Sequence, residues 1–113
     1  MPSVEYELVP RDNAPENAGF SMCVSDDCMA PYIGAGTRVY VCTGETPAEF
    51  GVGIFMYNGR VLCRQWCEDY TGALHLLCAN PARQSENIAI PPQARGTLVC
   101  LGRVLLDAPL PRP

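Results

Sequence analysis

Cys28 and Arg64 are the residues whose types and settings point most directly to chemistry. Cys28 follows Asp26 and Asp27 in a short segment that ends at Pro31, and Arg64 lies later in an apolar stretch. A cysteine thiolate is a strong nucleophile, and a neighbouring arginine cation favours the thiolate over the thiol. The two residues therefore suggest a sulfur nucleophile beside a fixed positive charge.

A general base for Cys28 is harder to find. Arginine stays protonated throughout the accessible pH range, so Arg64 cannot accept a proton. His75 is the only histidine, and it lies between two leucines. That setting favours a structural or surface role over catalysis. We therefore expect no working pair of nucleophile and base, and we keep cysteine catalysis as an alternative.

The other cysteines favour a reduced protein without a metal. The chain has seven cysteines, so they cannot all form internal pairs, and no two are separated by two residues. A structural zinc site usually has two closely spaced pairs of ligands. Most of these cysteines lie in apolar stretches, where a thiol behaves as a small buried hydrophobic group. We expect free thiols in a cytoplasmic protein, with no metal and no cofactor.

Composition limits the class of protein and its partners. Of 113 residues, 48% are hydrophobic and 18% are charged, which is typical of one globular domain rather than a disordered chain. The net charge of −4 opposes contact with nucleic-acid phosphates. No apolar run approaches the roughly 18 residues that a membrane span requires, and residues 1–10 lack the apolar run of a signal peptide. We expect no membrane association and no direct DNA contact.

The pattern of apolar and turn residues predicts a mostly β protein with little helix. Asn58 and Gly59 separate two apolar stretches, which is the strongest local signal for a β-hairpin. Residues 6–9 could add a short strand, and residues 80–87 are predicted to form a polar loop. Short strands with glycine turns are typical of a compact β-sandwich or partly closed barrel. The predicted strands are residues 20–24, 37–43, 52–57, 60–67, 73–79, 88–90 and 97–106.

The domain boundaries follow from the same pattern. Residues 1–19 are rich in proline, asparagine and glycine and are predicted to form an extended arm or linker. Residues 20–107 are predicted to form the single domain, and residues 108–113 a proline-punctuated tail.

The order of five short stretches resembles the C-terminal domain shared by LexA, the lambda-type phage repressors and their mutagenesis-protein relatives. This is a family of self-cleaving peptidases with a serine and a lysine at the active site and a signal-peptidase-like fold. Asp27, Met29 and Pro31 match the family pattern Val-x-Gly-Asp-Ser-Met-x-Pro. The five stretches are residues 24–31, 36–41, 50–55, 77–81 and 102–104.

Both catalytic positions of the family are substituted in this chain. Cys28 stands where the family has its serine, and Arg64 stands where it has its lysine. A buried lysine can become neutral and act as a base, whereas arginine cannot. Ala18-Gly19, the only dipeptide before Cys28 that resembles the family's cleavage site, is too close to Cys28 in the chain. The resemblance therefore implies a LexA-like fold that has lost self-cleavage. From the residues themselves we expect Asp26 and Asp27 to cap the turn and Asp27 to contact Arg64.

The resemblance also implies partners and a function. The family domain forms homodimers through the region of its C-terminal strand, which here points to Val99 and Leu101. Dimerisation tethers two N-terminal helix-turn-helix heads and so raises DNA affinity; this chain contains no such head. We expect a dimerisation and regulatory domain of a phage-repressor-like transcriptional regulator. The alternatives are a self-cleaving peptidase with a cysteine nucleophile and a ligand-sensing domain that uses the former catalytic cleft.

Overall fold

The computed structural model describes residues 6–8, 19–106, 108 and 110–111, and it confirms the mostly β class. Eight strands form one antiparallel sheet in the order β1-β2-β3-β8-β4-β5-β6-β7. The sheet is not closed, because β1 and β7 remain at its two edges. The strands are β1 (Tyr6–Leu8), β2 (Phe20–Cys23), β3 (Arg38–Thr43), β4 (Val52–Tyr57), β5 (Arg60–Glu68), β6 (Leu74–Leu77), β7 (Ile88–Ile90) and β8 (Val99–Val104).

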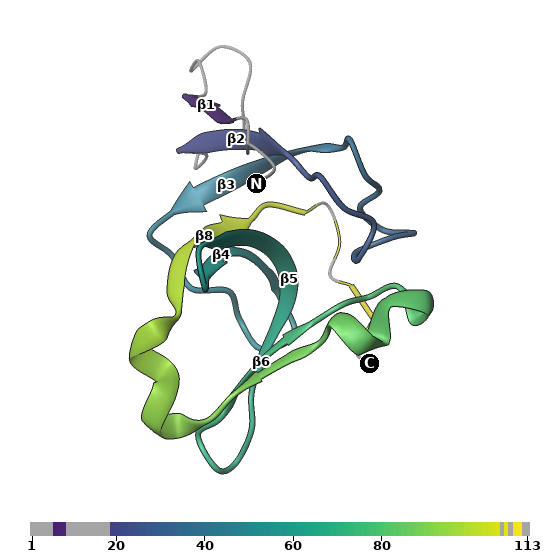
Figure 1. Cartoon of the computed structure of the whole chain (residues 1–113). Coiled ribbons are helices and arrows are strands. Elements are labelled where there is room, and N and C mark those ends of the chain that lie inside the picture. Colours follow the sequence, from purple (N-terminus) through teal and green to yellow (C-terminus); the bar gives the residue numbers. More distant parts are fainter. Residues whose placement is uncertain (1–5, 9–18, 107, 109, 112–113) are drawn as a thin grey trace.

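The last strand lies in the middle of the sheet. β8 pairs with β3 on one side and with β4 on the other, both antiparallel. Figure 1 shows β8 between these two strands, with β4 and β5 curving strongly beneath it. Its register against β4 shifts between Ile54 and Phe55. Such a bulge bends a strand and increases its twist, which fits the curvature of this part of the sheet.

The hairpin of β4 and β5 forms as the sequence predicts. Asn58 and Gly59 have φ angles of 50° and 74°, the positive values that a tight two-residue hairpin turn requires. The turn sets the register that places Gly53 opposite Arg64. This hairpin therefore carries Arg64 to its place in the fold.

The core consists of two hydrophobic clusters separated by the alternation of side chains along the strands. Ile54 and Cys63 belong to the first cluster, whereas their neighbours Phe55 and Leu62 belong to the second. Phe55 also stacks on Trp66, with 5.6 Å between ring centroids. Successive residues of β4 and β5 thus fill both clusters.

Two short 3-10 helices lie where the sequence analysis predicts irregular or extended chain. The predicted polar loop over residues 80–87 contains η2 (Pro81–Glu86). The second helix, η3 (Pro92–Thr97), lies between the predicted strands 88–90 and 97–106 and includes the first residue of the latter. Each helix has proline in its first turn, where the fixed φ of proline favours helical backbone and no amide hydrogen is needed. The strand prediction was therefore too long at this end, and β8 begins at Val99.

Both predicted terminal segments contact the domain where they are described. β1 lies within the predicted arm and pairs antiparallel with β2. In the predicted tail, Leu110 packs against the first core cluster. The buried side chain of Gln65 donates hydrogen bonds to the carbonyls of Phe50, at 2.9 Å, and Pro111, at 3.1 Å. In the described part of the chain, no helix has the length and apolar character needed to cross a membrane.

Candidate functional site

The turn that carries Cys28 is held in place by buried apolar side chains and by backbone hydrogen bonds. Val24, Met29 and Ile33 lie in the first core cluster, and Met29 is fully buried. The amide of Ile33 donates to the carbonyl of Met29 at 2.9 Å. Within the turn, the amide of Cys28 donates to Oδ1 of Asp26 at 3.3 Å. The motif residue Met29 thus anchors the turn, while Pro31 is exposed.

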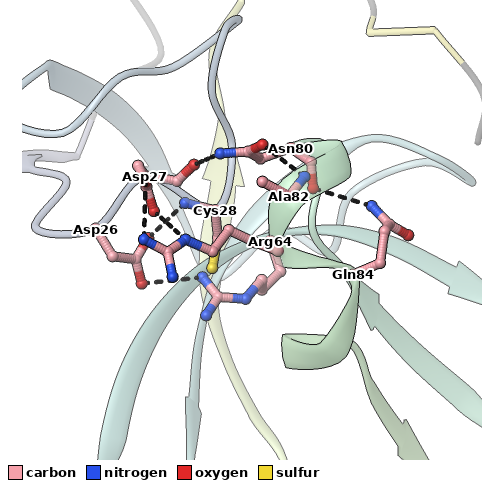
Figure 2. A network of polar contacts seen from close by, with 8 residues as sticks. Asp26, Asp27, Cys28, Arg64, Asn80, Ala82 and Gln84 are labelled. Carbon is pink, nitrogen blue, oxygen red and sulfur yellow. Dashed lines mark hydrogen bonds and ion pairs between the residues drawn. The ribbon is translucent and has the colours of Figure 1, made fainter.

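Arg64 is almost completely buried, with 1% of its surface exposed. Its Nη1 donates to the carbonyl of Cys63 at 2.8 Å and lies 3.4 Å from Oδ2 of Asp26. Its Nε is the only fully buried side-chain polar atom without a hydrogen-bond partner in the part of the chain that the structure describes. Figure 2 shows the guanidinium beside Asp26 and Cys28. A buried cation with a weak partner and an unsatisfied donor is an unusual and costly arrangement.

The expected contact between Asp27 and Arg64 does not form, and Asp26 takes that place. Asp27 instead accepts two hydrogen bonds from Arg83, at 2.8 Å from Nε and 3.3 Å from Nη2. These hydrogen bonds are the main reason why the pKa of Asp27 is lowered. Arg83 lies in the predicted polar loop over residues 80–87, where no pattern in the sequence indicates a contact with Asp27.

Asn80 connects the turn to η2, a role that was not predicted from the sequence. Its amide donates to the carbonyl of Cys28, and its Nδ2 donates to the carbonyl of Asp27, each at 2.9 Å. Its Oδ1 caps η2 by accepting from the amide of Ala82 at 2.9 Å (Figure 2). Asparagine directly before proline is a recognisable helix-start signal. That signal could have predicted η2, although not the contacts with the turn.

Cys28 and Cys78 are both buried, with 4% and 2% of their surfaces exposed. Their chain segments are joined by the amide of Asn80, which donates to the carbonyl of Cys28. Burial and, after it, the neighbouring Cys28 raise the pKa of Cys78 to about 12, against the opposing effect of the Arg64 cation. The two residues are distant in the sequence, so no short spacing indicated that they meet.

The side chain of His75 contacts Asp69. Its Nε2 lies 2.8 Å from Oδ2 of Asp69. The pKa of Asp69 is strongly lowered, first by this hydrogen bond and then by the one from Thr71. No described contact joins His75 to Cys28. Among the residues that the structure describes, no group of three or more histidine, cysteine or acidic side chains is arranged to hold a metal ion.

An open pocket of about 480 Å³ lies beside the turn, and its wall is strongly charged. It brings together carboxylates and guanidiniums in equal number, so their formal charges cancel. Cys28 is not among the residues that line the pocket. The charged lining consists of Asp26, Asp27, Glu86, Arg60, Arg64 and Arg83.

The residues predicted at the dimer surface differ in exposure. Val99 is 49% exposed, whereas Leu101 is partly buried against the first core cluster. Val99 lies directly opposite Met56 of β4, which is 40% exposed, and Met56 lies opposite Val61 of β5. These three side chains form an apolar row, Val99–Met56–Val61, across three neighbouring strands.

Neither the scan against protein-family models nor the search of curated proteins finds a match to this chain.

Proposed function

We propose that this chain is the C-terminal dimerisation and regulatory domain of a phage-repressor-like transcriptional regulator that has lost self-cleavage. The observation that carries the proposal is the apolar row of Val99, Met56 and Val61. Cross-strand partners in an antiparallel sheet have their side chains close together on one face. Covering such a row with a second copy removes apolar surface from water, and a two-fold dimer uses the same patch on both chains.

The buried position of Arg64 supports the loss of self-cleavage. A serine or cysteine nucleophile of this family type needs a neighbour that accepts its proton. The Arg64 guanidinium remains protonated, and it already donates to the carbonyl of Cys63. DNA binding in this proposal belongs to a helix-turn-helix domain joined to the N-terminal side of the domain. The acidic net charge of −4 is consistent with a part that does not contact DNA.

The proposed dimer is tested by measuring the molar mass in solution for the wild type, Val99→Asp and Tyr70→Asp. Tyr70 is the matched control, because it is a fully exposed apolar residue in the turn before β6. We expect a dimer for the wild type and Tyr70→Asp and a folded monomer for Val99→Asp, with folding checked by circular dichroism. A wild type that remains monomeric at high concentration contradicts the proposal, and so does a dimeric Val99→Asp.

The loss of self-cleavage has its own test. Family members cleave themselves at alkaline pH, so the chain extended by its upstream sequence is incubated at alkaline pH alongside its Cys28→Ala variant. We expect the wild type to remain intact. A fragment that forms in the wild type and is absent in Cys28→Ala supports the cysteine-peptidase alternative and overturns this part of the proposal.

A further inference from the structure

Arg64 has hydrogen-bond donors that its own chain does not use. Among the contacts that the structure describes, its guanidinium donates only through Nη1, to the carbonyl of Cys63 at 2.8 Å and to Oδ2 of Asp26 at 3.4 Å. Its Nε is fully buried and has no partner among the described residues. A guanidinium has five N–H donors in a planar fork that matches the two oxygens of a carboxylate. Because a buried cation without good partners is costly, a carboxylate from outside the chain would relieve that cost.

An outside ligand can reach this cation through the open pocket beside the turn. Arg64 is one of the residues that line the pocket, and so is Asp26, whose side chain is 38% exposed. Figure 2 shows these two side chains next to each other. The volume of about 480 Å³ lies within the range of about 300–1,000 Å³ that is usual for small-molecule sites. The pocket therefore presents a positive and a negative group side by side to a small molecule.

A second ion pair in the wall is already complete. Asp27 accepts two hydrogen bonds from Arg83, the shorter at 2.8 Å. The contact between Arg64 and Asp26, at 3.4 Å, is a single long one. A ligand that pairs with these two residues therefore replaces a poor contact, whereas one that separates Asp27 from Arg83 breaks a good one.

The charge of the whole wall favours a ligand that carries both signs. Arg60 and Glu86 add one exposed charge of each sign, and neither has a hydrogen bond or ion pair with another residue that the structure describes. A dianion such as phosphate meets three carboxylates along with the three guanidiniums. A molecule with one carboxylate and one ammonium group finds an opposite charge for each.

We propose that this pocket binds a free α-amino acid, whose carboxylate pairs with Arg64 and whose ammonium group pairs with Asp26. The two charges of an α-amino acid are attached to the same carbon, and the two protein groups are likewise adjacent, with 3.4 Å between Nη1 and Oδ2. This inference does not depend on the proposed repressor function, because it requires only the pocket and its charged side chains. Failure to bind amino acids therefore leaves the dimer test unaffected.

The test screens each of the standard α-amino acids separately against the full chain by saturation-transfer NMR. The affinity of the best binder is then measured by isothermal titration calorimetry, and its dissociation constant is expected to lie below about 1 mM. Its amide lacks the carboxylate charge, and its N-acetyl derivative lacks the ammonium charge. Each is expected to bind about tenfold more weakly or worse, because each loses a charge-assisted hydrogen bond. Inorganic phosphate is expected not to displace the amino acid.

Variants assign the two contacts. Arg64→Met is expected to abolish binding, and Asp26→Asn, which keeps the oxygen that accepts from the Cys28 amide, is expected to weaken binding about tenfold or more. Arg95→Gln is the matched control, because Arg95 forms an exposed ion pair with Glu68 and does not line the pocket. It is expected to bind as the wild type does, with folding of all variants checked by circular dichroism.

The measurements on the wild type decide the proposal even if a variant does not fold. The proposal is overturned if no α-amino acid binds, or if the amide or the N-acetyl derivative binds as tightly as the parent amino acid. Phosphate that binds more tightly than any amino acid would show a plain anion site instead. Full binding by a folded Arg64→Met would place the ligand elsewhere on the protein.

Discussion

Asp26 and Asp27 are neighbours in the sequence, yet each belongs to an arginine pair of a different kind. Asp26 faces Arg64, whose side chain is 1% exposed, at a long distance of 3.4 Å. Asp27 faces Arg83, whose side chain is half exposed, through two hydrogen bonds of which the shorter is 2.8 Å. The buried pair therefore has the poorer geometry, and the exposed pair has the better geometry.

An ion pair with good hydrogen-bond geometry need not make a large contribution to the free energy of unfolding. A well-aligned pair at the surface contributes little, because water and salt screen both charges. A buried arginine carries a desolvation penalty that its partners must offset, so even one long contact to Arg64 matters. We expect the weaker-looking contact to have the larger effect on stability, and the following variants test this expectation in order of decreasing effect.

The largest effect is expected for Asp26→Ala. This change leaves the Arg64 cation with only the Cys63 carbonyl and also removes the acceptor of the Cys28 amide. The free energy of unfolding is expected to fall by about 2 kcal/mol, as measured by urea denaturation at pH 7. A loss no larger than that of Asp27→Ala would reverse the comparison between the two pairs.

Asn80→Ala is expected to have the next largest effect. It removes the cap of η2 and leaves the carbonyl of Asp27 without its Asn80 partner. Loss of such a cap lowers the free energy of unfolding by about 1 kcal/mol. Asn80→Asp is the matched control, because it keeps the capping oxygen but not the donor to Asp27. If the two variants lower the free energy of unfolding equally, the loss comes from the hydrogen bond to the Asp27 carbonyl rather than from the cap of η2.

Asp27→Asn is expected to have a smaller, pH-dependent effect. The lowered pKa of Asp27 in the folded protein means that its ionised form stabilises the fold above the pKa of the unfolded chain, about 3.9. This contribution is lost as the pH falls through the lower pKa of the folded state. The difference between wild type and variant is therefore expected at pH 7 and expected to vanish in acid and in high salt. A difference that persists in acid would mean that the Arg83 ion pair is not its source.

Arg64→Met is expected to change stability least, within about 1 kcal/mol of the wild type, because a buried charge is replaced by an apolar side chain of similar length. The double variant Asp26→Ala/Arg64→Met completes the cycle. In the absence of the buried cation, loss of Asp26 is expected to cost much less than it does alone. Additive effects would show that Asp26 acts through the turn and not through Arg64.

The strands could be predicted from the sequence because their signals are local. Apolar stretches on either side of Asn58-Gly59 specify a hairpin without information from the rest of the chain, and that hairpin forms with both residues at positive φ. The position of β8 between β3 and β4 is not a local property, and no pattern within residues 97–106 could reveal it.

The contacts of the candidate site were harder to predict than its location. The sequence identified Cys28 and Arg64 as residues of interest, but it did not indicate Cys78 or Arg83 as their neighbours. Those contacts depend on how η2 is placed against the turn by Asn80. Whether Asp26 or Asp27 faces inward is decided by the orientation of the turn, since adjacent residues of the same type carry no signal that distinguishes them.

The central position of β8 also determines when this protein can fold. Of the strands that the structure describes, β8 is synthesised last, and until it is present β3 and β4 lack the neighbour that they share. A growing or truncated chain therefore exposes unpaired strand edges, which tend to associate with other chains. Sheets dominated by contacts between distant segments also fold slowly. We expect folding of most of the sheet to wait until β8 has been synthesised, so that a stop codon before Val99 yields an aggregating chain rather than a smaller folded one.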